Sequence, residues 1–133
     1  MPSITKLTLL TLATVVCAGG ATTVARAQAE DRITVDDKLA DQGGKLWKIK
    51  ACDGCHTIGG GRRAAPDLMG ATARRSASWL REWLKNPPEM AKSDEVAKQM
   101  VKEAGGSTMP NFRLKDEEIE ALLSFIARRS EKP

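Results

Sequence analysis

The feature that most constrains this chain is the stretch ACDGCHTIGG at residues 51–60. It places Cys52 and Cys55 two residues apart, with His56 directly after the second cysteine. His56 is the only histidine among the 133 residues of the chain. A site built on these three side chains must therefore be completed by other residue types, or by a group that needs no second histidine.

The first 29 residues have the pattern of a secretory signal peptide. Lys6 gives a short positive start, an apolar run follows, and Ala27-Gln28-Ala29 matches the small-x-small cleavage site. We expect residues 30–133 to form one domain outside the cytoplasmic membrane. A retained anchor is the alternative, because the uncharged run between Lys6 and Arg26 is just long enough to cross a bilayer.

A C-x-x-C pair on its own has several uses. A thioredoxin-like dithiol would lie among alternating strands and helices, and no segment here has a convincing strand pattern. A zinc site would need two more cysteine or histidine ligands. Signal removal takes away Cys17, which leaves Cys52 and Cys55 as the only cysteines. A disulfide between them would close a very small loop and add little stability.

C-x-x-C-H in an exported protein is instead the attachment signature of c-type haem. Two intervening residues let one tight turn bring both sulfurs to the two vinyl groups at one edge of the porphyrin. The next residue then lies under the iron. We therefore expect one covalently attached haem c, with thioethers to Cys52 and Cys55 and with His56 as the proximal iron ligand.

The sixth iron ligand must come from another residue type, because no second histidine exists. The methionine candidates are Met69, Met90, Met100 and Met109. Met109 stands in GGSTMPNF, a segment without helical pattern, and Pro110 favours an extended backbone there. We expect Met109 to be the distal ligand; a lysine, an asparagine or an open position is the alternative.

Apolar periodicity predicts an all-α fold. The predicted helices span residues 36–51, 77–86, 93–104 and 115–129. Pro87-Pro88 should end the second helix, and Ser93 should be the N-cap of the third. The long stretch between the first two helices has no sustained period and should wrap around something.

These residues resemble the class I c-type cytochromes over essentially all of residues 30–133. The matching segments are GGKLWKIKACDGCH, APDL, TMPNF and LKDEEIEALLSFIARR, which are similar to the family's first helix with haem motif, proximal loop, distal motif and last helix. The resemblance implies a cytochrome c fold, in which four or so helices wrap around one haem and the first and last helices cross.

The resemblance also implies roles for individual residues. The carbonyl of Pro66 should accept a hydrogen bond from the His56 ring and orient it, although Ala65 replaces the family's usual glycine. Gly43 or Gly44 should permit the close helix crossing, with Trp47 against Phe125.

A haem iron with two protein ligands has no vacant site for substrate, so the resemblance implies electron transfer and not catalysis. A periplasmic single-electron carrier is the expected function. The alternative is the haem c subunit of a periplasmic or membrane-attached oxidoreductase. The layout is also similar to the membrane-anchored cytochrome c subunit of bacterial nitric oxide reductase. A third interpretation is that the chain is a gas-binding or peroxidatic haem protein.

The charge bears on partners. The full chain has a net charge of +4, which falls to +2 when Lys6 and Arg26 leave with the signal peptide. Neither value nor export favours nucleic-acid binding. Redox proteins are the expected partners, docking at a basic surface around the haem edge. The basic residues that flank the motif are Lys45, Lys48, Lys50, Arg62, Arg63, Arg74 and Arg75.

Overall fold

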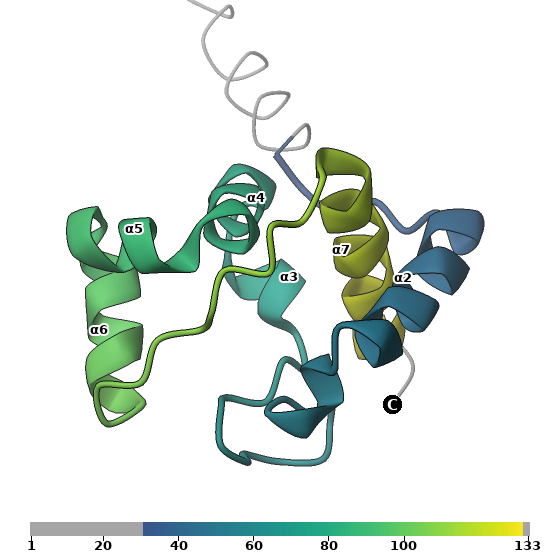
Figure 1. The fold of residues 1–133 in the computed structure, drawn as a ribbon. Coiled ribbons are helices and arrows are strands. Elements are labelled where there is room, and N and C mark those ends of the chain that lie inside the picture. Colours follow the sequence, from purple (N-terminus) through teal and green to yellow (C-terminus); the bar gives the residue numbers. More distant parts are fainter. Residues whose placement is uncertain (1–30, 132–133) are drawn as a thin grey trace, which may run out of the picture.

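The computed structural model describes residues 31–131, which form six α-helices and no β-strand (Figure 1). The helices are α2 (Asp37–Ile49), α3 (Ala71–Arg74), α4 (Ala77–Lys85), α5 (Pro87–Ser93), α6 (Glu95–Glu103) and α7 (Asp116–Glu131). A 3₁₀ turn, η1 (Cys52–Gly54), follows α2. The predicted all-α fold is confirmed, whereas the predicted signal segment lies outside the described residues.

No helix within residues 31–131 combines the length and apolar character needed to cross a membrane.

The centre of the fold is the pairing of α2 with α7, which lie side by side in Figure 1 although they are far apart in sequence. Gly43 is buried at their contact, and a Cβ atom there would lie 1.9 Å from the backbone oxygen of Ala121. The rings of Trp47 and Phe125 pack with their centroids 5.8 Å apart. The predicted crossing of first and last helices is confirmed, with Gly43 at the closest approach.

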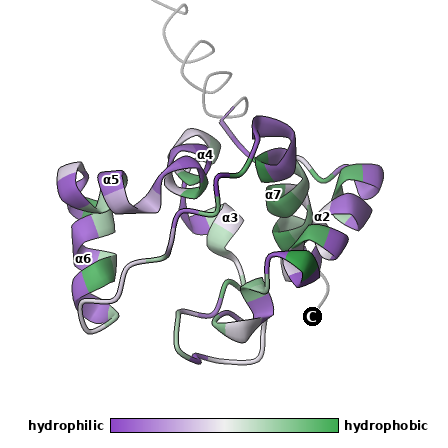
Figure 2. Ribbon diagram, viewed as in Figure 1, coloured by the Kyte–Doolittle hydropathy of each residue, from purple (hydrophilic) through white to green (hydrophobic). Residues whose placement is uncertain are grey.

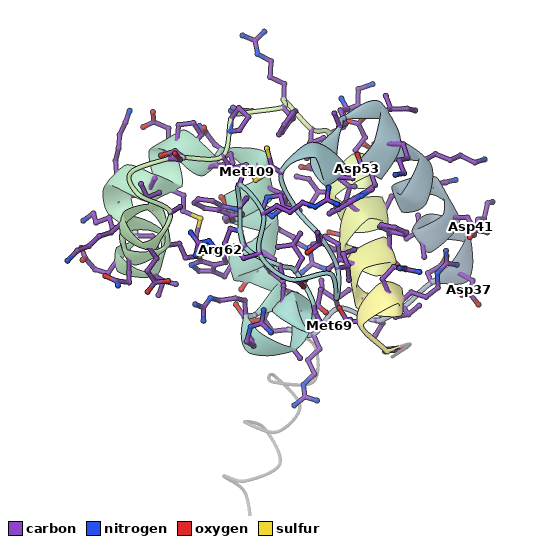
Figure 3. All side chains as sticks on the ribbon, turned by 90° about the horizontal axis from the view of Figure 1, so that it is seen from below. Asp37, Asp41, Asp53, Arg62, Met69 and Met109 are labelled. Atoms are coloured by element: carbon purple, nitrogen blue, oxygen red, sulfur yellow. The ribbon has the colours of Figure 1, made fainter. Side chains whose placement is uncertain are left out.

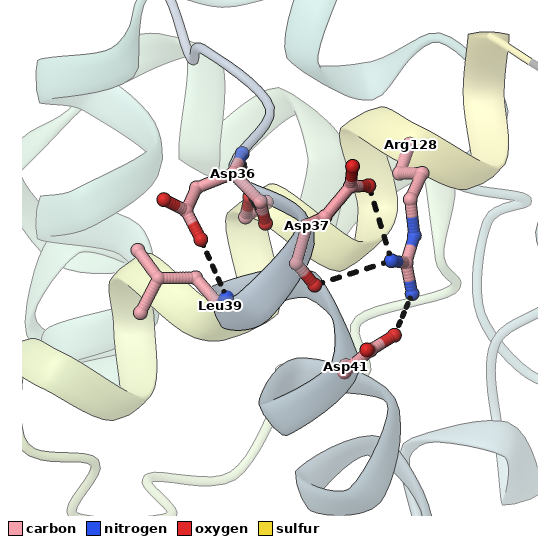
Figure 4. A network of polar contacts seen from close by, with 6 residues as sticks. Asp36, Asp37, Leu39, Asp41 and Arg128 are labelled. Carbon is pink, nitrogen blue, oxygen red and sulfur yellow. Dashed lines mark hydrogen bonds and ion pairs between the residues drawn. The ribbon is translucent and has the colours of Figure 1, made fainter.

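Polar contacts fix the relative position of the same two helices. Buried Ser124 Oγ accepts a hydrogen bond from Asp36 N at 2.9 Å and donates to Asp36 O at 3.0 Å. Arg128 contacts the Asp37 carboxylate at 3.4 Å and that of Asp41 at 2.8 Å (Figure 4). Because these contacts involve residues at the start of α2, they hold that end of the helix against α7.

Apolar side chains along α7 form much of the core. Figure 2 shows hydrophobic residues along α7 and at the end of α2, whereas hydrophilic and hydrophobic residues alternate on α6. The buried cluster comprises Trp47, Leu80, Leu114, Ile119, Leu122, Leu123 and Ile126. α4 joins it through Leu80 and is also tied to α7 by Arg81, which donates to Glu120 at 2.5 and 3.0 Å.

The middle of the chain corrects one prediction and adds two helices, α3 and α5, that were not predicted. α4 ends at Lys85 as expected, but Pro87 then begins α5. Proline fits a first helical turn because the N–H group that it lacks would have no partner within the helix there. Ser93 closes α5, and Asp94 is the N-cap of α6 in its place, accepting from Ala97 N at 2.8 Å. The short helix α3 was not predicted either, because four residues are too few to show a period.

The first predicted helix, residues 36–51, also stops earlier than expected. α2 ends at Ile49 because Ala51 takes the left-handed conformation with φ at 54°. This change of direction separates the helix from the cysteine motif.

Candidate functional site

The cysteine motif forms a tight turn directly after α2. Cys55 N donates to Cys52 O at 3.2 Å and His56 N donates to the same oxygen at 2.9 Å. The turn leaves Cys52 half-buried and Cys55 exposed, both as free thiols. Burial raises the pKa of the Cys52 thiol, which keeps its proton at neutral pH.

The His56 ring is held by the 57–70 loop. Its Nδ1 lies 2.8 Å from the carbonyl oxygen of Pro66. Because a carbonyl oxygen can only accept, Nδ1 carries the proton, and the other ring nitrogen, Nε2, keeps a lone pair. This is the contact that the resemblance implies for Pro66, and it leaves one nitrogen able to bind a metal.

Cys52, His56 and Met109 line one apolar cavity in the middle of the described fold. Its other walls are Trp47, Lys50, Leu68, Ala71, Thr72, Leu80, Trp83, Leu84, Phe112, Leu114, Leu122, Leu123 and Ile126. Cys55 and Pro66 do not line it. Of the four methionines within residues 31–131, only Met109 does so. Figure 3 shows Met69 well away from Met109.

Met109 lies in the segment of residues 104–115, which connects α6 to α7 (Figure 1). No helix includes it, as the sequence predicts. Asn111 holds the segment, since its Nδ2 donates to Asn86 Oδ1 at 3.0 Å and its Oδ1 accepts from Arg113 N at 2.8 Å. Phe112 and Leu114 then reach the cavity wall, so the residues that follow Met109 anchor the segment beside the cavity.

α4 contributes Trp83 to the aromatic part of the wall, beside Trp47 and Phe112. Trp79 and Trp83 stack with centroids 5.7 Å apart, and Trp83 lines the cavity. The Trp79 Nε1 group donates to Asp94 at 3.2 Å, which fixes α4 against the start of α6. The pKa of Asp94 is lowered, mainly by the Ala97 N–H and also by the Trp79 indole, so this carboxylate is charged at neutral pH.

One residue that organises the site, Asp67, was not predicted from the sequence. Asp67 accepts hydrogen bonds from Thr57, Gly59, Gly61 and Met69, all within the 57–70 loop. An acid that follows proline and lies near three successive glycines is the signal that could have found it. Without the fold, nothing shows that the carboxylate turns back toward those glycines.

Charges near the motif are partly compensated. Lys48 forms an ion pair with Asp53, and Lys50 lies 3.6 Å from Glu118. Arg62 donates to Glu103 O at 2.9 Å and Arg63 to Asp53 O at 3.2 Å, so each binds a backbone carbonyl group.

These residues fit a covalently attached haem. The cavity wall is almost wholly apolar, as a porphyrin requires, and Cys52 lies in that wall with the second thiol three residues on. His56 offers an sp² nitrogen and Met109 a thioether, both of which are haem iron ligands. No cluster of three or more histidine, cysteine or acidic residues suited to a metal ion alone occurs within residues 31–131.

Comparison with known proteins agrees with this geometry. The family model for cytochrome c matches residues 40–130. None of the curated proteins matches the chain. Among solved structures, a cytochrome c from Rhodothermus marinus is 30% identical, with a TM-score of 0.69, over 75% of this chain and 84% of its own.

Two further structures are similar. The cytochrome c domain of a Pseudomonas putida protein is 35% identical, with a TM-score of 0.60, over 68% of this chain and 89% of its own. An engineered form of the Rhodothermus marinus protein with a bound carbene intermediate is 30% identical, with a TM-score of 0.65, over 74% and 83% of the two chains. The chain therefore belongs to the cytochrome c family, whose members bind haem c covalently and transfer electrons.

Proposed function

We propose that residues 30–133 act in the periplasm as a single-electron carrier with a six-coordinate haem. Cys52 and Cys55 form the thioethers, and His56 and Met109 are the axial ligands. The observation that carries this proposal is that His56, whose Nδ1 is held by Pro66, and Met109 line one apolar cavity. No other described methionine lines that cavity.

Each group has a definite task in this function. Bound haem supplies one-electron chemistry at its iron. The carbonyl of Pro66 orients the His56 ring and makes it more basic. The cavity wall excludes water, which limits the rearrangement that a change of charge would demand. If His56 and Met109 both held the iron, no position would remain for a substrate, and this favours a carrier over an enzyme.

We also propose that acidic redox proteins dock beside the haem at Arg62 and Arg63. Both side chains are exposed and donate to backbone carbonyl groups, whereas Lys48 forms an ion pair with Asp53. Positive charge near a haem edge steers an acidic partner into contact. The periplasmic location rests on the signal-peptide pattern of residues 1–29.

An optical spectrum of the exported holoprotein tests the proposal. We expect a c-type spectrum when reduced and a methionine–iron charge-transfer band when oxidised. Met109→Ala should abolish that band, whereas Met100→Ala, on α6 and outside the cavity wall, should keep it. Retention of the band in Met109→Ala would overturn the ligand assignment.

The same preparation tests the carrier role and location. A monomer on size exclusion supports a free carrier, and co-purification with a second redox protein at a fixed ratio identifies a subunit instead. The mass of the exported chain distinguishes cleavage before Glu30 from retention of an anchor.

A further inference from the structure

The 57–70 loop contains a cradle of backbone N–H groups. Gly59 and Gly61 have φ angles of 83° and 79°, in the left-handed region that glycine adopts without strain. Backbone N–H groups that converge on one point form a concavity that binds anions, and here they come from Gly59, Gly61 and Met69. Here the anion is part of the chain itself, because the carboxylate of Asp67 occupies the cradle.

Both carboxylate oxygens of Asp67 accept two hydrogen bonds. Oδ1 accepts from Gly59 N at 3.0 Å and from Met69 N at 2.7 Å. Oδ2 accepts from Thr57 Oγ1 and from Gly61 N, each at 2.6 Å. These donors stabilise the charged carboxylate and lower the pKa of Asp67, with the Thr57 hydroxyl as the largest cause. The side chain of Asp67 thus holds the two ends of the loop together through four hydrogen bonds.

Asp67 is tied to the chain directly beside both partners of the His56–Pro66 hydrogen bond. Thr57, which it binds, follows His56 directly in the chain, and Pro66 directly precedes Asp67 itself. A backbone hydrogen bond from Leu68 N to Thr57 O, at 2.8 Å, joins the same two segments of the loop. The Pro66 carbonyl therefore has little freedom to move away from Nδ1.

We propose that Asp67 is a positioning residue that holds the Pro66 carbonyl against His56 Nδ1, and so sets the orientation and basicity of the proximal imidazole. This inference rests on the proposed function, in which His56 binds the haem iron. A looser Pro66 carbonyl weakens the hydrogen bond to Nδ1–H and makes the ring a poorer electron donor. The reduction potential should rise as a result.

Two variants of Asp67 separate position from charge. Asp67→Asn keeps the shape of the side chain but removes its negative charge. The amide nitrogen that replaces one carboxylate oxygen cannot accept the hydrogen bonds which that oxygen accepted. Asp67→Glu keeps the charge but carries the carboxylate one methylene further from Cα. If position matters, both variants disturb the imidazole; if only charge matters, Asp67→Glu behaves as the wild type.

The primary readout is hydrogen exchange of His56 Nδ1–H, followed by NMR in the reduced holoprotein. Loss of the positioning contacts should accelerate this exchange roughly tenfold in both variants. The midpoint potential should rise in both. Wild-type exchange in both variants, with a potential shift in Asp67→Asn alone, would overturn the proposal and leave only an effect of charge.

A milder variant keeps the test decisive if neither Asp67 variant yields holoprotein. Thr57→Val removes one of the four donors and preserves side-chain shape, and it should accelerate the exchange about threefold. An unchanged rate in Thr57→Val would then reject the positioning role. Failure of the proposed function shows separately, because a wild-type spectrum without low-spin haem would appear before any Asp67 variant is made.

Discussion

Gly43 shows how one absent side chain sets the distance between two helices. The backbone of α7 lies where a Cβ atom of residue 43 would be, and the nearest atom is the carbonyl oxygen of Ala121. Gly44 differs from its neighbour, since a Cβ there would lie 3.2 Å from the Phe125 ring edge, which can move. The sequence singled out both glycines, and only the structure shows which one makes the backbone contact.

We expect Gly43→Ala to destabilise the holoprotein by about 3 kcal/mol, because the added methyl group must push α2 away from α7. In Gly44→Ala, the gain of about 1 kcal/mol in helix propensity should offset a small shift of the Phe125 ring. Denaturant unfolding followed by circular dichroism measures both. Equal stability of Gly43→Ala and wild type would show that the crossing can relax without cost.

At the scale of elements, the N-cap decides where α6 begins. Ser93 and Asp94 are both good N-cap residues, and the sequence prediction placed the cap at Ser93. In the structure, Asp94 caps α6 and also accepts the Trp79 indole N–H, which Ser93 does not. The tertiary contact to α4 thus selects the helix boundary and links α6 to the cavity wall.

This dual role of Asp94 predicts a pH-dependent stability. Its pKa is lowered in the folded state, so its contribution is fully present above the unfolded value near 4 and is lost as pH falls through the folded value. Asp94→Ala should therefore be less stable than wild type at pH 7, and the difference should shrink as pH falls below 4.

Asp94→Asn provides the matched control. Asparagine caps a helix about as well but carries no titrating charge, so its stability should lack this pH dependence. Urea unfolding at pH 7 and at pH 3 compares the three proteins. A pH-independent difference between wild type and Asp94→Ala would contradict the role of the charge.

At the scale of the whole molecule, the core of the described fold is built around a cavity. The side chains of Leu80, Leu122, Leu123 and Ile126 belong both to the buried cluster and to the cavity wall. These four side chains are buried, and a haem would fill the cavity that they enclose. We therefore expect the protein to depend on its cofactor for folding as well as for function.

We expect the double variant Cys52→Ala with Cys55→Ala to yield little folded protein, because it cannot retain haem covalently. Cys55→Ala alone keeps one thioether and should keep the haem and the helical circular dichroism signal. Far-ultraviolet circular dichroism and haem absorbance of the exported proteins measure both. A haem-free double variant with native helix content would show that the polypeptide fills its own core.

The sequence by itself predicted much of this protein because the decisive signals are local. A C-x-x-C-H motif needs only one turn to be recognised, and the periods of residues 77–86 and 115–129 predicted α4 and α7 closely. The single histidine excluded competing metal sites by count alone. Met109 was singled out among four methionines because the adjacent proline marks an extended segment.

Only the tertiary structure decided which distant groups meet. It brought Met109 and His56 to one cavity, chose Gly43 over Gly44 at the helix crossing and gave Asp94 its second partner. It also places the Asp67 carboxylate within hydrogen-bonding distance of the Gly59 and Gly61 N–H groups, which composition could not reveal. The physical reason is that these contacts join residues far apart in the chain or reverse its direction, and local propensity carries no information about such pairings.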